Sequence, residues 1–170
     1  MPEIFKKAFP FALVYGALSI GFKIYIILSG LILTHFGFYY SHAVTLLFMI
    51  PHLFISLWMF RNKNFPDGMS GRTGFQFLLS VLVWIILIMS AYHAIEFRWK
   101  LQELAETYYR SAEYLNFLKK QSRIKPEDYP AIIEEQIKSL SVMKAVTSKI
   151  MAYMILGISS SFVFALLGKK

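Results

Sequence analysis

The chain has 170 residues and a formal net charge of +8, 56% of its residues are hydrophobic, and its mean hydropathy is +0.51. A soluble domain of this length cannot hide its four apolar runs of about twenty residues, and each run has the length that crosses a hydrocarbon core of about 30 Å. The sequence therefore predicts an all-α membrane protein with four transmembrane helices in the lipid bilayer. The chain has no cysteine, which excludes disulfides, thiol catalysis and cysteine-based metal sites.

The apolar runs divide the chain into three parts. Residues 1–95 hold the first three predicted spans, at about 9–33, 41–60 and 74–95. Residues 96–144 form a charged and aromatic insert, and residues 145–170 hold the fourth span, at about 146–167, and a basic C-terminus.

Small residues recur at four-residue spacing in two of the predicted spans. Ala12 and Gly16 form such a pair in the first span, and Gly157 and Ser161 form one in the fourth. Pairs of this kind let helix backbones approach closely in lipid. We expect the first and fourth spans to pack against each other within the chain, with dimerisation as the alternative.

The charges of the short loops predict the orientation of the chain. The two ends and the loop between the second and third spans carry many basic residues and few acidic ones: Lys6, Lys7, Arg61, Lys63, Arg72, Lys169 and Lys170 against Glu3 and Asp67. Cytoplasmic loops of membrane proteins have this excess of lysine and arginine. Both termini are therefore expected in the cytoplasm and the insert outside it. This distribution, rather than a nucleic-acid partner, accounts for the positive charge.

The insert has the pattern of an extracytoplasmic, antiparallel helical hairpin. Apolar residues recur in it at steps of three and four, which indicates one helix face, and a single helix is expected from about 75 to 120. Pro126 and Pro130 mark the turn, over residues 122–130, and the return helix is expected to continue into the fourth span. The two apolar stripes cover each other or leave a face that docks a partner. That face comprises Leu101, Leu104, Tyr108, Leu115, Ile133, Ile137 and Leu140.

Lys23 is the most unusual residue in the predicted spans. It lies about ten residues, or 15 Å, below the outer end of a first span that reaches residue 33. A lysine at that depth costs at least about 2.5–3.5 kcal/mol, so it should face protein or a wet cavity. Counting along the antiparallel spans predicts a mid-membrane polar layer of Lys23, His52, Ser159, Ser160 and Ser161. Alternatively, the first span ends near residue 28 and Lys23 extends outward to the headgroups.

A second polar group is expected at the outer interface and comprises His35, His42, His93 and Glu96. His93 and Glu96 share a helix face because they are three positions apart. Imidazoles beside a carboxylate can bind a divalent metal or relay protons. The chain has no compact metal-ligand spacing, however, and interfacial histidines commonly anchor span ends. We therefore predict no metal and no cofactor.

Three features follow one another along the chain in a characteristic order. The second span ends in Arg61-Asn62-Lys63-Asn64-Phe65, the third begins with Gly71-Arg72-Thr73-Gly74-Phe75-Gln76-Phe77, and the charged insert leads to a fourth span closing on Gly168-Lys169-Lys170. Over nearly the whole chain this plan resembles the DUF4199 family of small membrane proteins, found mainly in Bacteroidetes. The insert here is basic and aromatic, where the family leads us to expect one rich in glutamate and methionine. The resemblance implies a bacterial inner membrane and no established activity.

The motifs do not point to an enzyme, because there is no nucleophile motif and no glycine-rich phosphate loop. The leading hypothesis is an accessory or scaffold subunit of an envelope complex, which uses the hairpin to dock another membrane protein or a second copy of the chain. The alternative is that the chain binds or translocates an anionic lipid-linked substrate through the mid-membrane layer.

Overall fold

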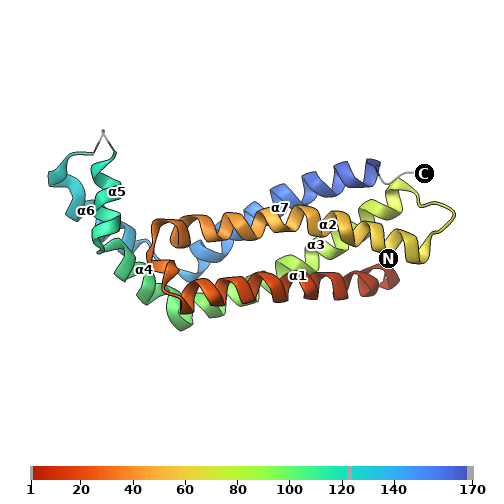
Figure 1. Ribbon diagram of the computed structural model, residues 1–170, viewed down its shortest axis with the longest axis horizontal. Helices are drawn as coiled ribbons and strands as arrows, with labels where there is room; N and C mark the ends of the chain where they lie inside the picture. The colour runs from red at the N-terminus through yellow and green to blue at the C-terminus, as the bar shows by residue number, and fades with distance from the viewer. Residues whose placement is uncertain (1, 122–123, 168–170) are drawn as a thin grey trace.

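The computed structural model describes residues 2–121 and 124–167, and the regular structure in these residues is helical throughout. Within these residues, four helices are long and apolar enough to cross a membrane, which confirms the predicted all-α architecture with four helices of spanning length. They run along the long axis of the molecule (Figure 1) and are α1 (Pro2–Leu28), α2 (Ser41–Asn64), α3 (Gly71–Glu96) and α7 (Val142–Leu167).

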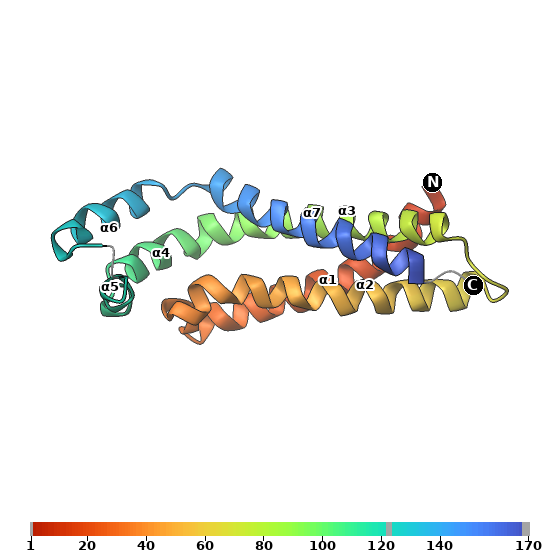
Figure 2. The ribbon, with the colours of Figure 1, turned by 90° about the horizontal axis from the view of Figure 1, so that it is seen from above.

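Shorter helical elements connect the long helices at one end of the molecule. Between α1 and α2 lie η1 (Leu31–Leu33) and η2 (Phe36–Tyr40), and between α3 and α7 lie η3 (Phe97–Leu101), α4 (Gln102–Tyr109), α5 (Ala112–Lys119), η4 (Pro126–Asp128) and α6 (Tyr129–Lys138). We call α4, α5 and α6 the cap. The start of α1, the α2–α3 loop and the end of α7 lie at the opposite end (Figures 1 and 2). Lys169, Lys170 and Ser122, used in the topology and turn predictions, lie outside the described residues.

The insert is broken into more helices than the apolar pattern predicts. Helix α4 ends at Tyr109, and Ser111 then starts α5 by accepting a hydrogen bond from the Tyr114 amide. Ser141 in the same way accepts from the Lys144 amide at the start of α7. Serine side chains favour such caps over helix interiors because they satisfy amides that the first turn leaves free. The expected continuous helices, from 75 to 120 and from the return segment into the fourth span, are therefore wrong.

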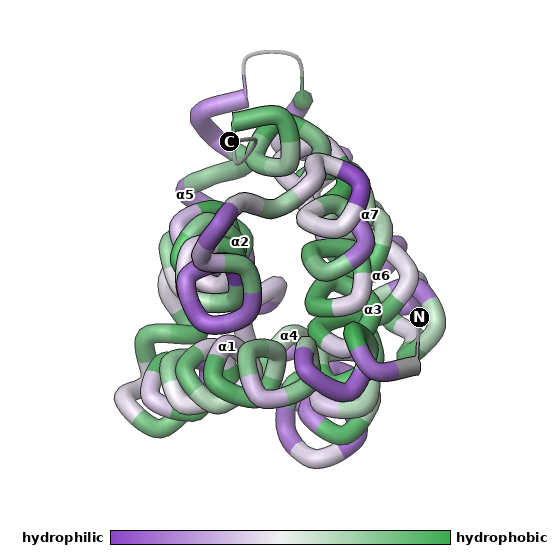
Figure 3. The backbone as a smooth tube through the Cα atoms, turned by 90° about the vertical axis from the view of Figure 1, so that its right-hand side faces the viewer, coloured by the Kyte–Doolittle hydropathy of each residue, from purple (hydrophilic) through white to green (hydrophobic). Residues whose placement is uncertain are grey.

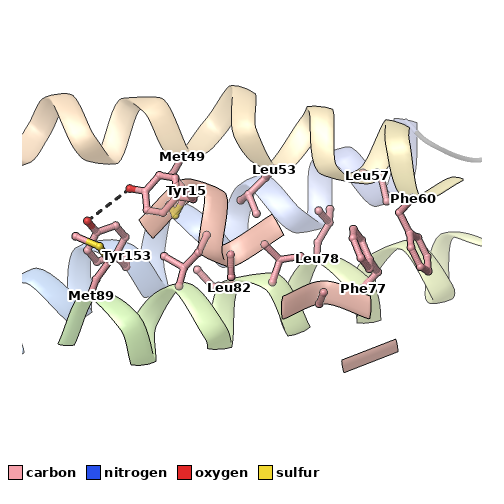
Figure 4. Close-up of a cluster of buried hydrophobic side chains, with 14 of the residues drawn as sticks. Tyr15, Met49, Leu53, Leu57, Phe60, Phe77, Leu78, Leu82, Met89 and Tyr153 are labelled. Carbon is pink, nitrogen blue, oxygen red and sulfur yellow. Dashed lines mark hydrogen bonds between the residues drawn. The ribbon is translucent and has the colours of Figure 1, made fainter. Parts of the chain in front are cut away.

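Helix α3 is the centre of the bundle, since it packs against both α1 and α7. The buried core between the long helices includes a stacked pair, Phe60 and Phe77, with ring centroids 3.8 Å apart (Figure 4). Gly16 and Gly157 lie at close approaches to α3, because a Cβ atom at either would meet a side chain of that helix. The small residues of the first and fourth spans thus seat both helices on α3 rather than on each other, which corrects the expected packing.

Large apolar side chains cover the outer surface of the long helices. Leu18, Leu47 and Ile155 are 68%, 63% and 61% exposed, on three different helices. Viewed end-on, the tube is hydrophobic along much of the four-helix bundle (Figure 3). So much exposed apolar surface would promote aggregation in water, whereas in a bilayer it contacts acyl chains.

Candidate functional site

A pocket of about 250 Å³ lies where the long helices meet the cap. Its polar wall comprises Lys23, His42, Gln136, Ser139, Ser141, Lys144, Ser148 and Lys149. Its apolar wall includes Ile32, Phe38, Phe97, Leu101, Tyr109 and Leu140. The pocket therefore combines several cationic groups with an apolar wall.

Lys23 reaches this pocket from within α1. Its side chain is buried, at 3% exposure, and Nζ donates a hydrogen bond to Ser41 Oγ over 2.8 Å. Helix α1 ends at Leu28, so Lys23 lies about 7.5 Å from the helix end. The ammonium thus extends toward the outer end of the first span, as the alternative prediction of a shorter span expects. It is buried beside Ser41, however, and does not reach the lipid headgroups.

The structure does not bring the predicted mid-membrane residues together. The His52 ring packs against Tyr15, with centroids 5.5 Å apart, and Tyr15 lies eight positions before Lys23, or about 12 Å along α1. Ser159 is exposed and Ser160 half-buried, while Ser161 is buried and its hydroxyl finds no partner among the described residues. The depth count failed because α1 stops at Leu28 rather than at residue 33.

The outer-interface group does form, apart from one member. Glu96 is 1% exposed, and its Oε2 accepts a hydrogen bond from His93 Nδ1 over 2.9 Å and lies 3.4 Å from Lys149 Nζ. Tyr92 donates to the other carboxylate oxygen over 3.1 Å. The His42 ring lies beside His93, with centroids 5.6 Å apart.

His35 lies elsewhere, under the cap. Its Nδ1 is 2.8 Å from the Tyr108 hydroxyl, and its ring stacks on Phe117. The connector that carries His35 folds against the cap, so it is not level with His42 on α2 as the linear count assumed. Within the described residues no three His, Asp or Glu side chains converge in the manner of a metal site.

Lys144 and Lys149 are site residues that the sequence patterns did not single out. Both lie near the start of α7. A lysine at the end of a span is ordinarily interpreted as an anchor of that helix end in the membrane interface. A signal was present, because Lys149 stands inside the predicted fourth span and Glu96 stands at the outer end of the third. Two opposite charges at one depth of neighbouring spans indicate an ion pair.

The predicted docking face is mostly covered within the chain. Tyr108 is fully buried and stacks on Phe38 at 4.4 Å, and Ile133, Ile137 and Leu140 pack into the same cluster. Leu101 and Leu104 instead pack beside Ile32 and its neighbours. Leu115 lines a separate groove on the outside of the cap. The stripe is therefore the core that joins the cap to the bundle.

Residues 10–170 match the model of a family described as "Protein of unknown function (DUF4199)". The chain belongs to the DUF4199 family. No curated protein and no solved structure matches the chain. The matched residues include every residue of the pocket, from Lys23 to Lys149.

Proposed function

We propose that this protein is a multi-pass protein of the bacterial inner membrane, with both termini in the cytoplasm and the cap outside, and that it binds the phosphate group of an anionic lipid in the pocket beneath the cap. The orientation is supported by the basic residues at the end opposite the cap, including Lys6, Arg61 and Lys63. A binding role without catalysis is supported by the lack of nucleophile motifs in the sequence.

The single observation that carries the proposal is the excess of positive charge in the pocket. Of its three lysines, only Lys149 has a carboxylate within 4.0 Å among the described residues. Lys23 is bonded to a neutral hydroxyl, and Lys144 has no ion pair in the same part of the chain. Two uncompensated ammonium groups suit a phosphate, which accepts strong charge-assisted hydrogen bonds.

The apolar wall indicates that the anion belongs to an amphiphile. Phe38, Phe97 and Leu140 line the same pocket as the lysines. A free phosphate would leave these surfaces without a contact, whereas a lipid places its headgroup on the lysines and the start of its chain on the rings. An anionic headgroup on the lysines and an acyl chain on the rings would satisfy both walls at once.

The test is a titration of the purified protein, in mild detergent, with phosphatidylglycerol, phosphatidylcholine and inorganic phosphate. We expect binding of phosphatidylglycerol that exceeds binding of both others. Lys144→Met should weaken it about 10–100-fold, the value of a hydrogen bond to a charged group. Lys100→Met removes a lysine near the same level that pairs with Glu103 outside the pocket, and it should bind as the wild type does.

Two outcomes would count against the proposal. Equal binding of phosphatidylcholine, whose phosphate charge is balanced by its choline group, would show that the pocket does not select a headgroup of net negative charge. Equal effects of Lys144→Met and Lys100→Met would show that binding follows overall surface charge and not the pocket.

The accessory-subunit role is a second candidate, favoured by one groove on the outside of the cap. It has a volume of about 300 Å³ and is lined by residues that include Leu115 and Ile133, beside an ion pair of 2.9 Å between Arg110 and Glu134. This groove retains a small part of the predicted docking face. A partner that co-purifies with the wild type and is lost from Leu115→Asp would support the role, and a partner retained by that variant would contradict it.

A further inference from the structure

Two imidazole rings at the pocket have buried nitrogens without a hydrogen-bond partner. His42 lines the pocket beneath the cap, and the His93 ring lies beside it, with centroids 5.6 Å apart. Both nitrogens of His42 and Nε2 of His93 are buried and have no partner within the described part of the chain. Buried polar groups in native proteins are almost always hydrogen-bonded. Three such atoms beside a pocket therefore indicate a site that a ligand or water completes.

His93 presents an acceptor nitrogen at this site. Its Nδ1 lies 2.9 Å from the Glu96 carboxylate, so Nδ1 must hold the ring hydrogen, because two lone pairs would otherwise face each other. Lys149 Nζ lies 3.2 Å from the same nitrogen, and this ammonium opposes a second proton on the ring. In the neutral imidazole the other nitrogen, Nε2, has a lone pair and no hydrogen. It therefore needs a partner that donates.

His42 needs both kinds of partner. A neutral imidazole has one N–H donor and one acceptor nitrogen, and neither nitrogen of His42 is bonded among the described residues. The three lysines that line the same pocket disfavour a positive charge on this ring. Together the two rings therefore lack two hydrogen-bond donors and one acceptor.

The phosphate of a lipid completes only part of this set. The free oxygens of a phosphodiester carry no hydrogen at neutral pH, so they accept hydrogen bonds and do not donate. They suit the lysines and the N–H of His42, but not the two acceptor nitrogens. Lys23 and Lys149 do not fill the gap, since they direct their hydrogen bonds to Ser41 and Glu96.

Two serines of the pocket add further acceptors. Ser139 and Ser148 line the pocket, and their hydroxyls donate to the carbonyl oxygens of Gln136 and Ala145, over 2.8 and 3.3 Å. Each serine oxygen keeps a lone pair that can accept. The pocket thus offers more acceptors than an anion can use, and a ligand that also donates hydrogen bonds fits it better.

We propose that the lipid bound in this pocket carries hydroxyl groups on its headgroup, as a glycerol or a sugar headgroup does, and that His42 binds one of them. The inference rests on the proposed function, because it concerns the same lipid whose phosphate the lysines bind. A hydroxyl both donates and accepts. Two neighbouring hydroxyls supply the two donors and the acceptor that the rings lack, and one bridging water can extend this reach to His93.

The test compares two lipids that differ only in their headgroup hydroxyls. Phosphatidylglycerol and phosphatidylpropanol with the same acyl chains have the same phosphodiester and the same net charge, but propanol has hydrogen where glycerol has two hydroxyls. Both are titrated into the purified full chain in mild detergent, with phosphatidylcholine as the third lipid. We expect phosphatidylglycerol to bind about 10-fold more tightly than phosphatidylpropanol, the effect of one hydrogen bond that the analogue cannot make. Phosphatidylpropanol should still bind more tightly than phosphatidylcholine.

Replacement of one ring assigns this preference to a residue. His42→Phe keeps an aromatic ring but removes both nitrogens, and it should bind the two anionic lipids equally. His52→Phe is the matched control, because His52 lies on the same helix, bonds to the Phe11 carbonyl oxygen and does not line the pocket. It should keep the preference. A purely structural effect of His42→Phe would weaken both lipids alike and leave their ratio unchanged.

The possible outcomes separate this inference from the proposed function. Equal binding of the two anionic lipids by the wild type, with both above phosphatidylcholine, would overturn the hydroxyl preference and leave phosphate binding in place. A preference that His42→Phe retains, or that His52→Phe also loses, would overturn the assignment to His42. Binding of neither anionic lipid above phosphatidylcholine would contradict both the proposed function and this inference.

Discussion

The Nζ atom of Lys149 in α7 lies 3.4 Å from Oε2 of Glu96, at the end of α3. The carboxylate side chain is fully buried and the lysine is 15% exposed, so water screens the pair little. His93 and Tyr92 also bond to this carboxylate, which makes Glu96 the centre of the polar cluster between the bundle and the pocket. Helix α7 is thus tied to α3 by charge at one level and by apolar packing below it.

Glu96→Gln should destabilise the protein by about 3–5 kcal/mol, because it leaves the buried Lys149 ammonium without its counter-charge. Thermal unfolding in detergent measures the change. Glu103→Gln is the control, since Glu103 also pairs with a lysine, over 2.7 Å, but is 70% exposed. Exposed pairs contribute about 0–1 kcal/mol, and equal losses in both variants would show that burial does not set the strength of the Glu96 pair.

Gly157→Ala should destabilise the protein by about 1–3 kcal/mol through overpacking. A Cβ atom at Gly157 would collide with the side chain of Leu82, which is buried in α3. Gly21→Ala places a methyl group where no atom lies within 4 Å, and it should stabilise α1 by up to about 1 kcal/mol through helix propensity. Thermal unfolding of both variants separates the effect of the close contact with Leu82 from the general effect of replacing a glycine. Equal shifts of the unfolding temperature in the two variants would contradict the overpacking at Gly157.

The sequence predicted the features that follow from hydrophobicity, which is a property of a whole segment. The four apolar runs became four long helices, and the three-residue spacing of His93 and Glu96 gave the contact that helix geometry requires. These predictions succeed because the helix repeat of about 3.6 residues per turn and the hydrocarbon thickness of about 30 Å are nearly constant.

The positions of helix ends could not be predicted in the same way. Gly30 adopts a positive φ of 74° after α1 has ended at Leu28, whereas hydropathy alone continues the span to residue 33. This difference of about 7.5 Å separated Lys23 from His52 and placed it beside Ser41 instead. The helix breaks in and beside the cap depend likewise on Ser111 and Ser141. Each serine accepts a capping hydrogen bond worth about 1 kcal/mol, and so small a difference in free energy decides whether the helix stops or continues.

Lys23→Met should raise the free energy of unfolding of the lipid-free protein by about 1 kcal/mol or more, because it removes a buried cation that lacks its own carboxylate. Its neighbour Ser41 keeps a hydrogen bond to the Gly37 carbonyl oxygen, so the Ser41 hydroxyl stays paired. The same change should reduce the stabilisation that added phosphatidylglycerol gives. Thermal unfolding with and without the lipid measures both effects, and a less stable variant that keeps its full lipid response would contradict this account of Lys23.

Tyr108→Ala should loosen the cap, at a cost of about 3–5 kcal/mol for a large buried aromatic side chain. Tyr108 stacks on Phe38 and contacts Tyr109 and Tyr114, so its removal opens the core that joins α4 and α5 to the α1–α2 connector. Trypsin should then cleave after Lys119 or Lys120 faster than in the wild type. Tyr108→Phe loses only the bond to His35, worth about 1 kcal/mol, and a cleavage rate equal to that of Tyr108→Ala would show that the ring does not hold the cap.

Single cysteines should report the orientation of the chain directly, because the protein has no cysteine of its own. Lys120→Cys in the cap should react with a membrane-impermeant thiol reagent in intact cells whose outer membrane has been permeabilised. Asp67→Cys, in the α2–α3 loop, should react only after the inner membrane is also opened. Both positions are exposed, so a lack of reaction reflects sidedness and not burial. The reverse pattern would place the cap in the cytoplasm and the basic loop outside, against the charge rule from which the orientation follows.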